Sequence, residues 1–148
     1  MAASSNYLLD TNILVALIRG NRLAQYLDQQ YALRASLREC AISAVTVGEI
    51  LALTRIFGWG TAKVDALYAF FEELVVIDIN HPDIYAAYAD IEHATVSVSQ
   101  QMGKNDVWIA ATSRATQMPL LTTDKDFDRL VPNWISREWV DEVHGKSP

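Results

Sequence analysis

Four acidic residues stand where a carboxylate is costly unless it has a partner. Each adjoins an apolar segment, and the surrounding sequence offers no obvious basic partner to Asp10, Glu49, Asp106 or Asp124. Burying a charge costs free energy unless something pairs with it. Because carboxylate oxygens are ligands that Mg²⁺ and similar cations prefer, the four acids predict a site for a divalent cation.

A carboxylate cluster around Mg²⁺ or Mn²⁺ is suited to phosphodiester hydrolysis. Metal-bound water supplies a nucleophile near neutral pH and the cation neutralises developing charge, so no protein nucleophile is required. Competing chemistries lack their motifs in this sequence. His81, His93 and His144 have no zinc-binding spacing, and there is no Walker loop, dinucleotide-binding glycine motif or serine nucleophile elbow.

The apolar patterning predicts the elements that must position these acids. Strands are expected at Tyr7–Leu9, Ala41–Ser43, Leu74–Ile77 and Leu120–Thr122, with a weaker one near Trp134–Ile135. Helices are expected at Asn12–Ile18, Arg22–Leu37, Ala44–Phe57, Ala62–Glu73, Asp83–Ser97 and Asp106–Thr116, with a short turn at Lys125–Leu130. This alternation predicts an α/β fold with a mostly parallel central sheet of about five strands, flanked by helices.

The predicted topology gives the four acids a common location. In parallel sheets, ligands bind beyond the carboxyl ends of the strands. Asp10 and Asp124 each lie at such an end, and Glu49 is about two helical turns past the strand at Ala41–Ser43. Asp106 starts the helix that precedes the strand at Leu120–Thr122. One crevice can therefore collect all four.

Three of the acids also have a purely structural explanation. Asp10 is a good N-cap for a helix that begins at Asn12. Asp106 favours the dipole in the first turn of its helix, with Asn105 as the cap. Asp124 is placed to cap the turn that follows it. None of these explanations excludes a functional role, because helix starts surround the crevice of a parallel sheet.

Glu49 has two competing explanations as well. Thr46 to Glu49 matches a capping box, in which the glutamate reaches back to the threonine amide. A helix that begins nearer Ser43 instead puts Glu49 on an apolar stripe facing the core or a cleft. We favour the cleft.

Composition limits the class of protein. With 148 residues, 51% hydrophobic and 20% charged, the chain can build one domain with a full core. The single cysteine, Cys40, fits a buried thiol in a reducing cytoplasm, and neither a signal peptide nor a membrane span is expected. A net charge of −6 argues against a protein that binds nucleic acid directly, but bound cations would reverse the sign locally.

Four segments together resemble a known family. Leu8–Asn12, Val47–Ile50, Asn105–Thr112 and Leu121–Phe127 are similar, in order and spacing, to the motifs of PIN domains, and most similar to VapC-type toxin ribonucleases. The resemblance runs from about Asn6 to Ile135. It implies a single PIN-like domain over residues 1–148, with a motif-bearing core at about 6–135.

The resemblance implies an Mg²⁺- or Mn²⁺-dependent ribonuclease that leaves 5′-phosphate and 3′-hydroxyl ends. It also implies that the metal-binding and catalytic residues are Asp10, Glu49, Asp106 and Asp124, and that Asp10 and Asp106 bind the metal directly. Supporting positions, which orient a carboxylate or the attacking water or make a secondary contact, are Thr11, Asn12, Thr122, Thr123 and Asp126. Lys104, Arg114 and Lys125 are candidate phosphate contacts, with exposed solvating charge as the competing explanation.

The same resemblance implies a toxin–antitoxin pair. The expected partners are RNA as substrate, a cognate antitoxin whose C-terminal segment blocks the site, and a second copy of the chain in a homodimer. Two other functions stay open. One is a PIN-type nuclease of RNA processing or decay outside any toxin pair. The other is a non-catalytic protein-binding module whose carboxylates are structural caps.

Overall fold

The centre of the fold is a sheet of five short parallel strands. A computed structural model of the protein describes residues 6–145. Within them the strands are β1 (Leu8–Leu9), β2 (Ala41–Ser43), β3 (Val75–Ile77), β4 (Leu120–Thr122) and β5 (Arg137–Trp139). Their order across the sheet is β3-β2-β1-β4-β5, and every pairing is parallel. The predicted α/β class, with about five mostly parallel strands, is confirmed.

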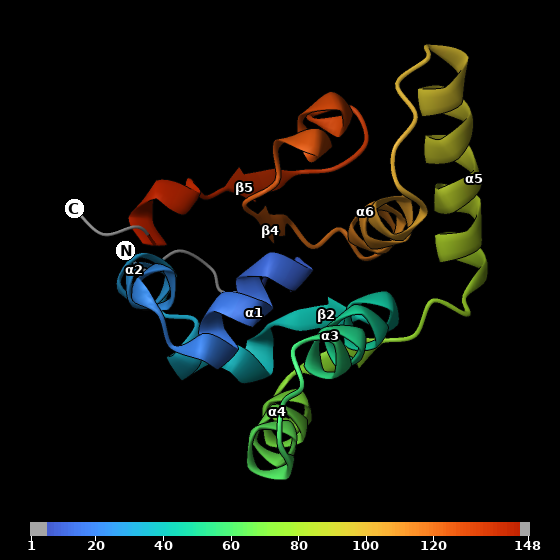
Figure 1. Ribbon diagram of the computed structural model, residues 1–148. Coiled ribbons are helices and arrows are strands. Elements are labelled where there is room, and N and C mark those ends of the chain that lie inside the picture. Colours follow the sequence, from blue (N-terminus) through green and yellow to red (C-terminus); the bar gives the residue numbers. More distant parts are fainter. Residues whose placement is uncertain (1–5, 146–148) are drawn as a thin grey trace.

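Helices cover both faces of this sheet (Figure 1). The α-helices are α1 (Thr11–Arg19), α2 (Arg22–Tyr31), α3 (Ala44–Ile56), α4 (Thr61–Glu73), α5 (Pro82–Ser97) and α6 (Lys104–Thr116). Three short 3₁₀ segments complete the described chain: η1 (Arg34–Glu39), η2 (Lys125–Leu130) and η3 (Glu142–Gly145). In Figure 1, α5 and α6 lie together on one side, and α1 to α4 lie on the other.

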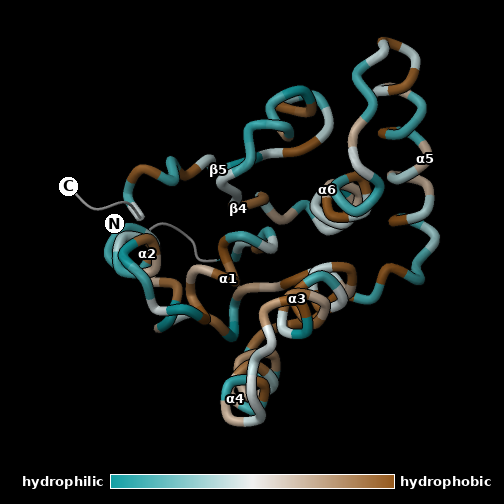
Figure 2. The backbone as a smooth tube through the Cα atoms, viewed as in Figure 1, coloured by the Kyte–Doolittle hydropathy of each residue, from teal (hydrophilic) through white to brown (hydrophobic). Residues whose placement is uncertain are grey.

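Alternating strand residues form two separate cores. Leu8 and Leu9 are both fully buried, and successive strand side chains point to opposite faces. Leu9 packs in the cluster that contains Ile13 of α1, whereas Leu8 packs in the cluster that contains Val107 of α6. Figure 2 shows the hydrophobic residues of α5 on the side that faces α6. Each fully buried leucine stabilises the fold by roughly 1.5–3 kcal/mol, so the sheet is anchored from both faces.

Tight strand-to-helix joints place the helix starts at the carboxyl edge of the sheet. Asp10 directly follows β1 and accepts a hydrogen bond from the Thr11 amide, so it caps α1. Ser43, the last residue of β2, caps α3 by accepting from the Val45 amide. No loop separates either strand from its helix, and the first helical turns therefore border the crevice.

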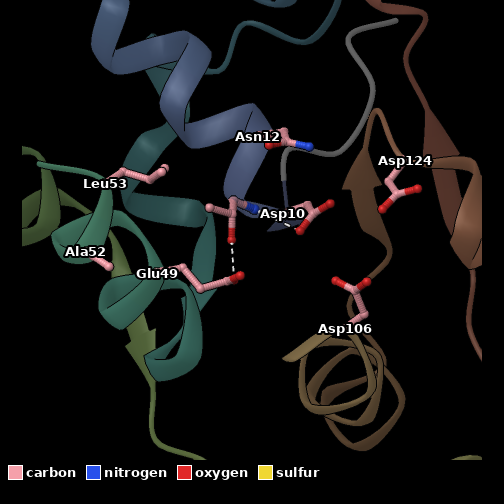
Figure 3. A pocket seen from close by; sticks show the side chains of 8 residues that line it. Asp10, Asn12, Glu49, Ala52, Leu53, Asp106 and Asp124 are labelled. Atoms are coloured by element: carbon pink, nitrogen blue, oxygen red, sulfur yellow. Dashed lines mark hydrogen bonds between the residues drawn. The ribbon is translucent and has the colours of Figure 1, made fainter. Parts of the chain in front are cut away.

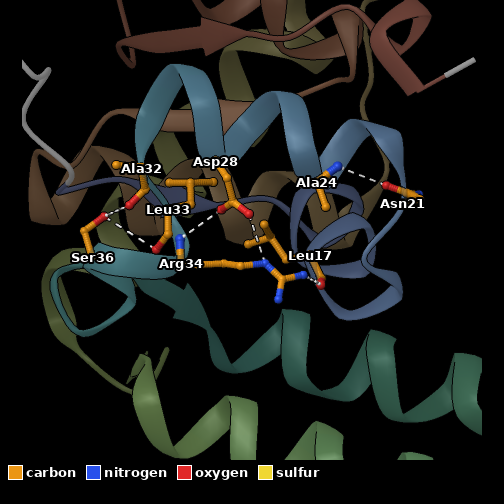
Figure 4. Close-up of polar contacts among 8 residues, drawn as sticks. All are labelled: Leu17, Asn21, Ala24, Asp28, Ala32, Leu33, Arg34 and Ser36. Atoms are coloured by element: carbon orange, nitrogen blue, oxygen red, sulfur yellow. Dashed lines mark hydrogen bonds and ion pairs between the residues drawn. The ribbon is translucent and has the colours of Figure 1, made fainter.

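The helix predicted over Arg22–Leu37 is interrupted in the structure. Its α-helical part ends at Tyr31, because Ala32 adopts a left-handed conformation with φ of 51°. Figure 4 shows the contacts that fix this break. The Arg34 guanidinium donates to the Leu17 carbonyl at 2.8 Å and pairs with Asp28 at 3.0 Å. These bonds bring the segment after the break back against α1, where η1 leads into β2.

Two further boundaries differ from the sequence prediction. The prediction of a strand near Trp134–Ile135 is wrong. The amides of both residues donate to the Leu130 carbonyl, which folds this segment back on η2. The last strand is instead β5. Helix α6 begins at Lys104 with Gly103 in the cap position, so Asn105 is not its cap. The other predicted helices and strands agree with the structure to within one residue.

No helix among residues 6–145 is both long enough and apolar enough to cross a bilayer.

Candidate metal centre

Acids from separate elements meet where the sheet reverses its order. Strands β1 and β4 are neighbours at the centre of the sheet, and successive strands are added outward from them in opposite directions. This is the position at which open α/β sheets bind ligands. A cavity of about 380 Å³ lies there, lined by Asp10, Thr11, Asn12, Glu49, Ala52, Leu53, Asp106 and Asp124. The structure thus brings all four predicted acids to one cavity.

Asp10 is held rigidly at the base of this cavity. Its side chain is only 5% exposed. One carboxylate oxygen accepts from the Thr11 amide at 2.8 Å, and the other accepts from the Thr122 hydroxyl at 2.6 Å. The same hydroxyl accepts a hydrogen bond from the Asp124 amide at 2.9 Å. Thr122 therefore connects the acid that ends β1 to the acid that follows β4.

Glu49 occupies the opposite side of the cavity. Because α3 begins after Ser43, Thr46 lies inside the helix and the capping box does not form. Thr46 is buried, and Glu49 lines the cavity one turn further along. Its carboxylate accepts from the Thr11 hydroxyl at 2.7 Å, drawn as a dashed line in Figure 3. This bond ties the Glu49 carboxylate to the first residue of α1 while it faces the cavity.

The tightest acidic group combines Asp106 from α6 with Asp124 and Asp126 from the segment after β4. One carboxylate oxygen from each lies within 4.8 Å of the others. Figure 3 shows the carboxylates of Asp10, Asp106 and Asp124 pointing toward one another. Asp124 also caps η2, since its side chain accepts from the Asp126 amide at 2.8 Å. Asp124 therefore caps η2 and also contributes a carboxylate to the acidic group.

The electrostatics of the cavity favour a cation. Burial raises the pKa of Asp10, and the neighbouring Asp124 and Glu49 raise it further, against hydrogen bonds from Thr122 and Thr11 that lower it. Burial also raises the pKa of Asp106 to about 6, with the charges of Asp10 and Asp124 adding to the effect. Like charges held this close repel one another unless something neutralises them.

The residues present fit a divalent cation. None of the described residues that line the cavity is basic, and the polar groups that point into it offer oxygen atoms. Oxygen donors, several of them carboxylates, are what Mg²⁺ and Mn²⁺ prefer. By position, Asp106, Asp124 and Asp126 could hold an ion together. Asp10 lines the same cavity with its carboxylate directed toward Asp106 and Asp124, and Glu49 lies across the cavity.

The predicted supporting and phosphate-binding residues separate into two groups. Thr11, Asn12, Thr122 and Asp126 contact or border the acids. The Thr123 hydroxyl turns instead to the carboxylate of Glu142, at 3.2 Å.

Of the three basic candidates, only Lys125 borders the same region. Lys104 pairs closely with Glu92 of α5. Arg114 donates to the Trp134 carbonyl near the far end of α6, about 12 Å along the helix axis from Asp106. The structure therefore does not bring Lys104 or Arg114 to the cavity.

Sequence reasoning missed two residues beside the cluster, Trp139 and Glu142. Trp139 ends β5, and its indole N–H donates to the Thr123 carbonyl at 3.0 Å. A correct placement of the last strand would have marked Trp139 as a residue at the carboxyl edge of the sheet. Glu142 lies in η3, and no sequence signal pointed to it.

The hydroxyl of Thr122 is expected to matter for both stability and metal binding. Thr122→Val keeps the shape but removes the donor to Asp10 and the acceptor for the Asp124 amide. We expect unfolding free energy to fall by about 1–2 kcal/mol and metal affinity to fall by about 10- to 100-fold. Thermal unfolding and metal titration measure these two effects.

Thr112→Val is a matched control for that substitution, since Thr112 is equally buried but bonds only the Trp108 carbonyl of its own helix. Equal metal affinities in the two variants would contradict the role given to Thr122.

Comparison with known proteins agrees with this geometry. The chain resembles, at a TM-score of 0.75 and 23% identity, a chain in the crystal structure of VapBC2 from Rickettsia felis bound to a promoter DNA fragment, covering 91% of this chain and 98% of that one. It resembles a chain of DNA-bound VapBC from Salmonella typhimurium at a TM-score of 0.72 and 18% identity, covering 93% and 98%. It resembles a chain of a toxin–antitoxin complex from Klebsiella pneumoniae at a TM-score of 0.65 and 23% identity, covering 90% of this chain and 99% of that one.

A search of curated proteins finds no match. The sequence model of the PIN domain, in contrast, matches residues 7–131. This range includes Asp10, Glu49, Asp106 and Asp124. Since the match spans most of the chain, and the parallel sheet carries its acids at the point where the strand order reverses, this protein belongs to the PIN domain family.

Proposed function

We propose that this protein is an Mg²⁺- or Mn²⁺-dependent endoribonuclease, with a catalytic unit at about residues 6–135. The observation that carries the proposal is the convergence of Asp10, Asp106 and Asp124 on one cavity, with no basic side chain among the described residues that line it. Structural caps do not explain this convergence, because a cap needs only its own helix. Membership of the PIN family supports the same chemistry.

The chain's own residues orient the cluster. Asp10 is fixed by two hydrogen bonds, and Asp124 is fixed by its bond to the first turn of η2. Asp106 must be ionised to act as a ligand, which its pKa of about 6 allows near neutral pH. A bound divalent cation supplies an activated water and neutralises charge on the phosphate. Glu49, held by Thr11, is placed to accept a proton or a hydrogen bond at the edge of the cluster.

We further propose that the protein is the toxin of a type II toxin–antitoxin pair and acts in the cytoplasm as a homodimer. The fold neighbours support the toxin–antitoxin part of this proposal, since they come from VapBC structures and from a toxin–antitoxin complex. A cognate antitoxin would supply the DNA-binding surface, which fits a chain of net charge −6.

The decisive experiment incubates the purified protein with a mixed pool of single-stranded RNA and Mg²⁺ or Mn²⁺, with and without EDTA. Cleavage that EDTA abolishes, with 5′-phosphate and 3′-hydroxyl ends, supports the nuclease. A folded protein that neither cuts the pool nor binds either metal would contradict the nuclease and favour the non-catalytic protein-binding module. A second experiment separates a toxin from a nuclease of RNA processing. Growth arrest when this protein is expressed, relieved when a small neighbouring gene is expressed with it, favours the toxin.

A further inference from the structure

A second cavity opens directly beside the acidic one. Its volume is about 290 Å³, and it shares Asn12 and Asp124 with the first cavity. The rest of its lining comes from the segment after β4, from the last residue of β5 and from the chain after β5. The residues used below are Thr123, Lys125, Trp139, Asp141 and Glu142. A polymer whose reacting phosphate lies at the acids would extend naturally into this space.

An aromatic ring is held in position in the second cavity. Trp139 is half-buried, and its indole N–H donates to the Thr123 carbonyl at 3.0 Å. Its strand partner in the sheet is Thr122, which bonds Asp10. The ring is therefore fixed to the same backbone that carries the metal cluster. A rigid half-exposed aromatic ring is the usual platform on which proteins stack an unpaired nucleobase.

A cation lies over this ring. The Lys125 ammonium is 4.6 Å from the ring centroid, and Lys125 is the one basic residue among the described residues that line the two cavities. Lys125 is exposed, and its flexible stem allows the ammonium to move from the ring to a phosphate oxygen. Among the described residues that line these two cavities, Lys125 is therefore the one that would attract an anion.

The acids of the second cavity determine how a nucleotide would lie in it. Asp141 and Glu142 repel a phosphate, but their carboxylates can accept hydrogen bonds from the amino groups of a base. The phosphate is therefore favoured next to Lys125, and the base is favoured between Trp139 and the acids. This arrangement suits a single-stranded nucleotide, because a paired base cannot reach an aromatic platform.

We propose that the second cavity binds the nucleotide next to the cleaved phosphate, with Trp139 as the stacking platform and Lys125 as the phosphate contact. This inference rests on the proposed function, since it takes single-stranded RNA as the substrate. It adds residues that set substrate affinity and base preference, and it gives the acidic chain a contact with RNA that does not pass through the metal.

The test measures binding and not only cleavage. The parent protein for this test carries Asp10→Asn, so that the RNA is not cut. Each further substitution is added to this parent, and its binding to a labelled pool of short single-stranded RNA is measured by fluorescence anisotropy with Mg²⁺ present. We expect Trp139→Leu to raise the dissociation constant about 5- to 150-fold, the range for losing one stacked base. Trp139→Phe keeps a ring and should retain most of the affinity.

Trp134→Leu is the matched control. Trp134 is also half-buried and also has a cation over its ring, Arg114 at 4.7 Å, but its own cavity shares no lining residue with the acidic one. It should bind RNA like the parent. In Asp10-containing protein, sequencing of the cut ends should show that Trp139→Leu flattens the base preference at one position beside the cut, which loss of stability alone would not do.

The outcomes separate the two proposals. Equal RNA affinity in the parent, the Trp139→Leu variant and the Trp134→Leu control, or no RNA binding at all, overturns the subsite. Binding that depends on Trp139 in a protein that never cuts RNA supports the subsite and overturns the nuclease.

Discussion

Replacing Asp10 by Asn is expected to lower RNA cleavage by about a thousandfold or more while leaving the fold intact. Asp10 is the most buried of the four acids and is already oriented by Thr11 and Thr122. Asn is almost isosteric but brings no negative charge to the cation. Metal ions supply several kcal/mol of transition-state stabilisation, and about 1.4 kcal/mol corresponds to tenfold in rate. Single-turnover cleavage at saturating Mn²⁺ measures the loss.

Stability should move in the opposite direction from activity. In metal-free protein the Asp10 charge is buried near other acids, so its removal relieves a desolvation cost and repulsion. This gain offsets the loss of one of the two hydrogen bonds, because Asn has a single acceptor oxygen for the donors Thr11 and Thr122. We expect the melting temperature of metal-free Asp10→Asn to equal or exceed that of the wild type, by up to about 4 °C. Asp65→Asn, on the exposed surface of α4, is the control and should change neither quantity. An Asp10→Asn protein that melts lower and still cuts RNA would favour the structural-cap explanation.

Divalent metal is expected to stabilise the protein strongly, and only above about pH 6. At a metal concentration about one hundred times the dissociation constant, binding adds about 2.7 kcal/mol. For a chain of this size that corresponds to roughly 5–10 °C in melting temperature. The ligands must be ionised, and the pKa of Asp106 is about 6. The stabilisation should therefore shrink as the pH falls through 6.

The metal-free protein should show the reverse pH dependence in the same window. The folded-state pKa of Asp106 lies above its ordinary value, so the folded protein binds a proton more readily than the unfolded chain. This group therefore destabilises the fold above pH 6, and the cost shrinks as the pH falls below 6, vanishing only below the ordinary aspartate pKa of 3.8. Asp10, whose pKa is also raised, acts in the same direction.

Melting curves from pH 5 to 8, with Mg²⁺ and with EDTA, test both slopes. The two melting temperatures should be furthest apart at pH 8 and should converge toward pH 5. Asp106→Asn should weaken the pH dependence of both curves. Curves with and without metal that run parallel across this range would show that these carboxylates do not bind the ion.

Local sequence patterns were sufficient for most of the fold. The strands at Ala41–Ser43 and Leu120–Thr122 and the 3₁₀ segment Lys125–Leu130 agree residue for residue. Each is a run of apolar residues or a capped turn with its signal in the same few residues. Because parallel strands align their carboxyl ends, the meeting of Asp10 and Asp124 could also be predicted.

The two largest errors have different causes, one a contact that is distant in sequence and the other a local turn. The break after Tyr31 depends on Arg34 reaching the Leu17 carbonyl, a bond that no pattern in the segment encodes. The last strand was misplaced because Ile135 is apolar and buried, yet it belongs to a turn and not to the sheet. Trp139 was missed for the same reason, since its importance depends on where β5 ends.

The distribution of the acids along the chain has a consequence for the time at which activity arises. Asp10 is made before Asp106 and Asp124, and β1 gains its neighbour β4 only when residues 120–122 are made. A nascent chain therefore carries an incomplete acidic cluster until Asp124 has been made. For the nuclease proposed above, this order would place a delay between translation and the first RNA cleavage, during which a partner that binds the growing chain could act.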